Sequence, residues 1–166
     1  MTLTTHAITG AALATLIPNY PILGFVVGFG SHFILDAIPH WDYYHPVSKK
    51  EDEIDLNNGL ALGKGFLKIG IKDLLKIGID GLLGLLLSFV LLGTLHQHSL
   101  WAIFMGAIGG MTPDALQFFY FRWKHEPLKS LQRFHVWFHS KTNLDDKPII
   151  GILSQVAIIC FIVLIF

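Results

Sequence analysis

The residues best suited to chemistry lie at the end of an apolar stretch that covers residues 21–38. His32 and Asp36 stand four positions apart, so on a helix they project from one face, one turn apart. An imidazole and a carboxylate at the end of a lipid-embedded helix cost free energy unless a partner pairs with them, and a divalent metal ion can do so. We therefore predict that His32 and Asp36 bind metal. A His–Asp hydrogen bond that only stabilises the helix end is the alternative.

Other segments supply the same residue types. His6 stands near the N-terminus, His40 follows Pro39, and Asp80 and Asp114 interrupt later apolar runs. Aspartates inside membrane segments are costly and usually functional, although Asp114 could cap a helix and Asp80 could pair with a lysine. A second pair, His135 and His139, is also four positions apart and resembles the two-histidine half of many zinc sites. An amphipathic surface helix with incidental histidines is the alternative. The predicted ligands are His6, His32, Asp36, His40, Asp80, Asp114, His135 and His139. Asp42, His45 and His125 are expected on the solvent side, or at most in contact with the ligands and not with the metal.

These ligand types define the expected chemistry. The single Cys160 lies inside the last apolar run, so no thiolate site is expected, and imidazole with carboxylate suits Zn²⁺, Mn²⁺ or Fe²⁺. The candidates exceed the needs of one ion, which predicts two or three metals. Such clusters clamp both oxygens of a phosphoester and activate a water molecule. Asp36, Asp114 or Asp80 would bridge metals, and Arg133 could bind a phosphate oxygen with two hydrogen bonds.

The composition indicates an integral membrane protein. Only 14% of the 166 residues are charged, 52% are hydrophobic and the mean hydropathy is +0.55. We predict an all-α fold, a polytopic helical bundle forming one domain over residues 1–166. Net charge is zero, so charge alone does not favour nucleic acid, and membrane lipids are the expected partners.

About five membrane-embedded helices should position the ligands. They are expected over residues 4–17, 22–38, 79–95, 100–121 and 149–166, because breakers or polar segments separate these apolar runs. Between the second and third, Lys64, Lys68, Lys72 and Lys76 recur every four residues. This spacing predicts a basic amphipathic helix over residues 59–78 that lies on the membrane surface.

The charge distribution brings the candidate ligands to one side. All 12 Lys and Arg residues lie in segments 49–76 and 122–147, whereas turns 18–21 and 96–99 contain none. The positive-inside rule therefore places the two basic segments in the cytoplasm, in an inner or plasma membrane. The predicted ligands then fall at the cytoplasmic face, while His96 and His98 fall outside. This convergence predicts one shared metal site.

Four short motifs resemble a known family: Thr5-His6-x-x-x-Gly10, His32-x-x-x-Asp36, Pro113-Asp114 and His135-x-x-x-His139. They resemble the membrane-bound metal-dependent hydrolases, whose ligand pattern is similar to the zinc-dependent phospholipase C and S1/P1 nuclease fold. The resemblance implies metal-dependent hydrolysis, with His6, His40 and the two spaced pairs as ligands. Three features depart from the family pattern. Pro-Asp lacks the usual following Asp and His, His135 lacks a following Arg-Gly, and the last pair is His/His and not His/Glu.

We therefore expect a membrane-embedded hydrolase that acts on a phosphoester of a lipid or lipid-like substrate at the cytoplasmic face. Two other classes remain open. One is a cation or proton transporter subunit, although its polar residues should then span the full membrane depth. The other is a non-catalytic scaffold that a metal stabilises.

Overall fold

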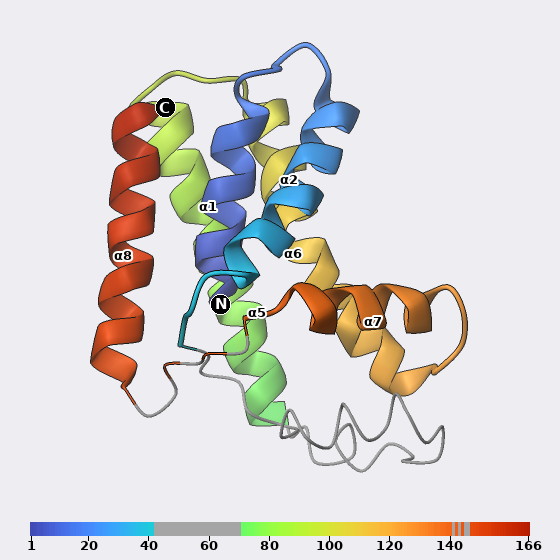
Figure 1. Ribbon diagram of the computed structural model, residues 1–166. Helices are drawn as coiled ribbons and strands as arrows, with labels where there is room; N and C mark the ends of the chain where they lie inside the picture. Colours follow the sequence, from blue (N-terminus) through green and yellow to red (C-terminus); the bar gives the residue numbers. More distant parts are fainter. Residues whose placement is uncertain (42–70, 141, 143, 145–146) are drawn as a thin grey trace.

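The protein is described from a computed structural model, which covers residues 1–41, 71–140, 142, 144 and 147–166. These residues form helices and no strand, so the predicted all-α class is confirmed. The helices are α1 (Leu3–Ala14), α2 (Pro21–Asp36), α5 (Ile71–Ser88), α6 (Leu100–Arg122), α7 (Leu128–Phe138) and α8 (Pro148–Ile165). A π-helical segment, η1 (Phe89–Thr94), continues α5 without a break. Figure 1 shows α7 lying crosswise to α1, α5 and α8.

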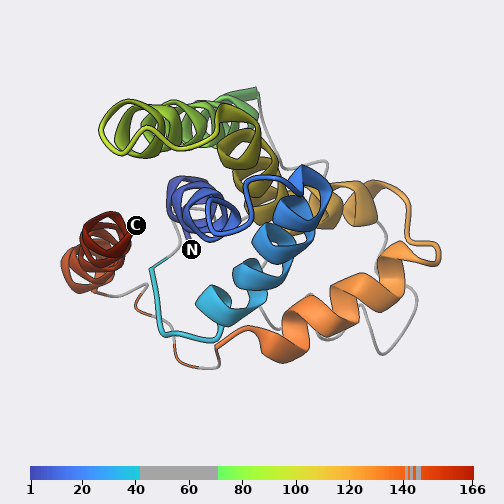
Figure 2. The same ribbon diagram turned by 90° about the horizontal axis from the view of Figure 1, so that it is seen from above.

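Helix α1 lies at the centre of the bundle. Viewed from above, it is surrounded by α2, α5, α6 and α8, and it contacts each of them (Figure 2). Its small side chains, including Ala7 and Ala11, are fully buried with Leu92 and Ile103. Small residues allow helix backbones to approach closely.

Glycines set the distance between α1, α2 and α6. A Cβ atom at Gly10 or Gly28 would overlap the carbonyl oxygen of Gly106, which belongs to the rigid backbone of α6. Glycine is therefore required at these crossings by close approach, and a side chain there would push helices apart. This contact matters for the site because α1, α2 and α6 each carry predicted ligands.

Gly28→Ala is expected to destabilise the protein by about 2 kcal/mol, because overpacking forces the backbones apart. Gly30 is the matched control on the same helix, since a Cβ there meets nothing within 4 Å. Gly30→Ala should be neutral or stabilising by up to about 1 kcal/mol, since alanine favours helix more than glycine does. Thermal unfolding of both variants in detergent checks this. Equal unfolding temperatures would show that the crossing tolerates a methyl group.

Two helices are long and apolar enough to cross a membrane: Leu75–Thr94 and Pro148–Ile165, with mean hydropathies of 2.1 and 2.7. Only 17% and 11% of the residues in these stretches are buried within the protein, and many of their apolar side chains are exposed. Leu164, for example, is 85% exposed.

The expectation of about five spanning helices is not confirmed. Helix α1 has 12 residues and α2 has 16, which at 1.5 Å per residue is too short for a full span. Helix α6 has 23 residues and is long enough, but it is not among the helices that are also apolar enough to cross a membrane. The predicted surface helix over 59–78 lies largely outside the described residues. Its last part belongs to α5, which continues into the membrane-length helix.

Candidate metal centre

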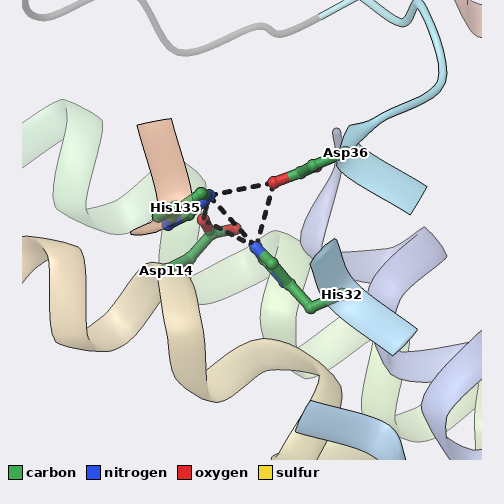
Figure 3. A group of neighbouring side chains, drawn as sticks. All are labelled: His32, Asp36, Asp114 and His135. Atoms are coloured by element: carbon green, nitrogen blue, oxygen red, sulfur yellow. Dashed lines mark hydrogen bonds and ion pairs between the residues drawn. The ribbon is translucent and has the colours of Figure 1, made fainter. Parts of the chain in front are cut away.

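Four predicted ligands from three helices meet at one point. His32 and Asp36 lie on the last turns of α2, Asp114 on α6 and His135 near the end of α7 (Figure 3). One potential ligand atom of each lies within 4.8 Å of the others. Separations of this size are compatible with a shared metal ion. We call these four residues the first group.

The distances within the first group centre on the Oδ2 atom of Asp36. It lies 2.9 Å from His135 Nε2 and 3.1 Å from His32 Nε2. Asp114 Oδ1 is 3.5 Å from His32 Nε2 and 3.9 Å from His135 Nε2. Asp36 is 2% exposed, whereas Asp114 is 28% exposed. Asp114 therefore marks the side from which a ligand or substrate could approach.

The hydrogen bonds of His32 determine which nitrogen faces the carboxylates. Its Nδ1 lies 2.8 Å from the carbonyl oxygen of Gly110, which can only accept, so Nδ1 carries the proton. In neutral His32, Nε2 is then a lone pair that faces the oxygens of Asp36 and Asp114. Acceptors that face one another repel unless a donor or a positive charge lies between them. A metal ion, a protonated imidazole or the Nε2–H group of His135, 3.3 Å from Nε2 of His32, would each remove this repulsion.

A second group consists of Asp36, His40 and His139, whose ligand atoms also lie within 4.8 Å of one another. His40 donates Nδ1–H to the carbonyl of Ile38 at 2.7 Å, which directs its Nε2 toward Asp36 Oδ1, 3.8 Å away. His139 donates Nδ1–H to the carbonyl of Ser140 at 3.3 Å. Carbonyls that hold a histidine by its second nitrogen are typical of metal ligands. Asp36 is common to both groups and could bridge two ions.

His6 is a further histidine at Asp36, in addition to those of the two groups. It is fully buried, and its ring stacks on that of His32 with centroids 3.9 Å apart. Its Nε2 lies 3.2 Å from Asp36 Oδ1, yet neither ring nitrogen forms a hydrogen bond with the described residues. The terminal amine of Met1 lies 3.4 Å from the same oxygen. Buried polar atoms without hydrogen bonds need an explanation, and a bound ion is one.

Asp80 is placed differently from the other predicted ligands. It accepts hydrogen bonds from Leu3 N at 2.6 Å, from Thr4 Oγ1 at 2.6 Å and from Thr4 N at 3.4 Å. These donors belong to the first turn of α1, whose N–H groups have no partner within the helix. Asp80 thus caps α1 from α5 and lies in neither group.

Arg133 also stays apart from the two groups. It is exposed on α7, and at 100° per residue it lies about 200° around the helix from His135. Asp42 and His45 are outside the described residues. His98 lies at the opposite end, where its Nε2 donates to the carbonyl of Phe166 at 2.7 Å.

One supporting residue was not anticipated from the sequence. The Gln155 Oε1 on α8 accepts from Thr2 N and Thr2 Oγ1 at 3.0 and 2.9 Å, and from Thr5 Oγ1 at 3.2 Å. Its Nε2 donates to the carbonyl of Trp41 at 2.8 Å. Gln155 thereby ties α8 to the start of α1 and to the segment that carries His40. A lone amide within the most apolar helix was the available signal.

Comparison with known proteins adds no relative. No protein-family model, curated protein or solved structure matches the chain. The functional argument therefore rests on the two groups around Asp36.

Proposed function

We propose that the protein is a membrane-embedded, metal-dependent hydrolase of a phosphoester in a lipid or lipid-like substrate. The observation that carries this proposal is the sharing of Asp36 by two groups of potential ligands. A carboxylate between two ions is the arrangement that two-metal phosphoesterases use. The resemblance to membrane-bound metal-dependent hydrolases, drawn from the sequence motifs, agrees with it.

The donor set favours particular ions. Both groups offer imidazole nitrogens and carboxylate oxygens, and the one cysteine, Cys160, lies on α8 and belongs to neither. Such a set suits Zn²⁺, Mn²⁺ or Fe²⁺. His32, His135, Asp114 and Asp36 Oδ2 would hold one ion, and His40, His139 and Asp36 Oδ1 a second. His6 would complete the shell on the Oδ1 side.

Divalent ions held there would supply Lewis acidity toward a phosphoryl oxygen and would lower the pKa of a bound water. The protein's own residues would restrict access to the ions and balance their positive charge. Asp36 and His32 are buried, so they fix the ligand geometry, whereas Asp114 meets the open side. Asp114 is therefore the carboxylate best placed to orient a water or a substrate. Arg133 lies too far around α7 to bind a substrate at this point.

A lipid substrate follows from the surroundings of the site. The two membrane-length helices, with outward-facing apolar side chains, would hold the protein in a bilayer. Both groups lie at one end of the bundle. We assign this end to the cytoplasmic face because segments 49–76 and 122–147, which contain all 12 lysines and arginines, connect helix ends on that side. A substrate held in the same leaflet could reach the site without crossing the membrane.

The purified full-length protein is expected to retain about two divalent ions and to hydrolyse a phosphoester in a chelator-sensitive way. Metal analysis by mass spectrometry, followed by a screen of phospholipids and water-soluble phosphoesters, tests both parts. Bound metal without hydrolysis of any substrate would favour a structural metal. If the protein binds no metal under any loading condition, a proton or a hydrogen bond from His135 satisfies Nε2 of His32, and the proposal is wrong.

A further inference from the structure

Helix α7 has two opposite faces, and only one of them belongs to the metal centre. Gln132 and His135 are buried on the inner face. Trp137 lies two positions after His135, about 200° around the helix, and is 74% exposed. Arg133 lies on the same outer side, and Phe134, 43% exposed, lies at its border, where its ring packs on Phe33 of α2 with centroids 4.9 Å apart. A tryptophan and a phenylalanine are thus displayed on a helix whose inner face holds a candidate ligand.

More aromatic surface lies at the end of α6, just before α7. Phe119 and Trp123 are 43% and 52% exposed, and their rings stack with centroids 5.8 Å apart at an interplanar angle of 5°. The orientation of α7 indicates how this surface could meet a membrane. Helix α7 runs crosswise to α8 and to α5, and these two helices form most of the membrane-length stretches (Figures 1 and 2). A helix crosswise to membrane spans at one end of a bundle lies parallel to the bilayer plane.

Basic residues accompany the aromatic ones. Arg133 is exposed, and Lys129, one turn earlier, is partly exposed. The nearby acid, Glu126, is engaged within the helix start: its Oε2 accepts from Ser130 Oγ at 2.7 Å and from Ser130 N at 3.1 Å. Those hydrogen bonds, together with the charges of Arg133 and Lys129, lower the pKa of Glu126. Basic residues beside tryptophan and phenylalanine are typical of helices at the boundary between acyl chains and anionic headgroups.

We propose that the outer face of α7 binds the bilayer interface, with Trp137 and Phe134 at the acyl-chain boundary and Lys129 and Arg133 on anionic phospholipid headgroups. A bilayer is favoured over a protein partner because α7 lies crosswise to the membrane-length helices and presents aromatic and basic side chains together. The inner face of α7, with His135, then lies at headgroup depth. This binding does not depend on hydrolysis.

Fluorescence quenching by brominated lipids tests the position of Trp137. The full-length protein carrying Trp41→Phe, Trp101→Phe and Trp123→Phe is reconstituted in vesicles, with bromine at shallow or deep acyl carbons. Trp137 emission should be quenched more strongly by shallow than by deep bromine. If the triple variant does not fold, the difference in quenching between the native chain and Trp137→Phe gives the same readout.

Headgroup preference is measured with brominated phosphatidylglycerol and phosphatidylcholine. Phosphatidylglycerol should quench Trp137 more effectively, since each basic residue near an anionic surface changes lipid affinity by about fivefold. Lys129→Gln with Arg133→Gln should remove this preference. Lys129→Arg with Arg133→Lys keeps both charges and should retain it.

Two results would overturn the proposal. Quenching by aqueous iodide and by neither brominated lipid would place the outer face of α7 in water. Protection from all quenchers would place it against protein. Metal content measured on the same samples reports on the metal centre separately, so failure of one proposal can be distinguished from failure of the other.

Discussion

Asp36→Asn is expected to abolish binding of both metal ions and to lower hydrolysis by more than about 100-fold. Its two carboxylate oxygens face different histidines: Oδ2 lies 2.9 Å from His135 Nε2, and Oδ1 lies 3.2 Å from His6 Nε2. An amide has the same shape but carries no negative charge, and it can offer only one oxygen. Loss of a residue that only hydrogen-bonds a metal ligand already lowers metal affinity or activity 10- to 100-fold. Loss of a ligand shared by two ions should therefore lower them further.

Asp80→Asn is the matched control for this substitution. It makes the same chemical change at a predicted intramembrane ligand, but the Asp80 carboxylate on α5 accepts hydrogen bonds from the first turn of α1. The variant should keep its metal and its activity and lose about 1 kcal/mol of stability, the usual value of a helix cap. Metal analysis, hydrolysis and thermal unfolding of both variants separate the two roles. If Asp36→Asn kept full metal content and activity, the shared-ligand assignment would be wrong.

The sequence predicted the ligands whose spacing is local. His32 and Asp36 lie on one continuous helix, so the separation of four positions was enough to place them together. Asp114 was uncertain because Pro113 precedes it and a helix could have started there. Helix α6 continues through Pro113, so Asp114 is an interior helical residue and not a cap. Its position one turn beyond Gly110, whose carbonyl holds His32, depends on how α2 and α6 pack.

Spacing alone was misleading for the second histidine pair. Four positions between His135 and His139 suggested two ligands on one helical face, but α7 ends at Phe138. His139 has an extended backbone, with φ of −60° and ψ of 136°, and joins Asp36 and His40 instead of the first group. A helix end depends on where tertiary contacts hold the chain, here a hydrogen bond of 2.8 Å from Ser140 N to the carbonyl of Asp36. Such contacts are not visible in the sequence.

The partner of a carboxylate within an apolar segment was equally hidden. Asp80 and Asp36 have the same residue type and, by the charge pattern, the same expected depth. One satisfies the unpaired N–H groups at the start of α1, and the other faces histidines. Hydropathy and charge identify that a partner must exist, because an unpaired carboxylate in lipid is costly. Only the packing of α1 against α2 and α5 decides which partner it is.

If Asp36 bridges two ions, removal of one histidine from each group should remove one ion at a time. His135→Gln is expected to lower metal content from about two ions to about one, because His135 belongs only to the first group. His40→Gln should likewise remove one ion, because His40 belongs only to the second group. Both variants should lose hydrolysis, because a two-metal mechanism needs both ions to stabilise the attacking and leaving oxygens.

Metal analysis of the two variants and of their double substitution checks this independence. The double variant should resemble Asp36→Asn, with close to no bound metal. His98→Gln provides the control for glutamine substitution of a histidine, since His98 contacts the carbonyl of Phe166 at the other end of the bundle. Loss of both ions from either single variant would contradict two separable sites. It would indicate one site in which all of these histidines act together through the carboxylate of Asp36.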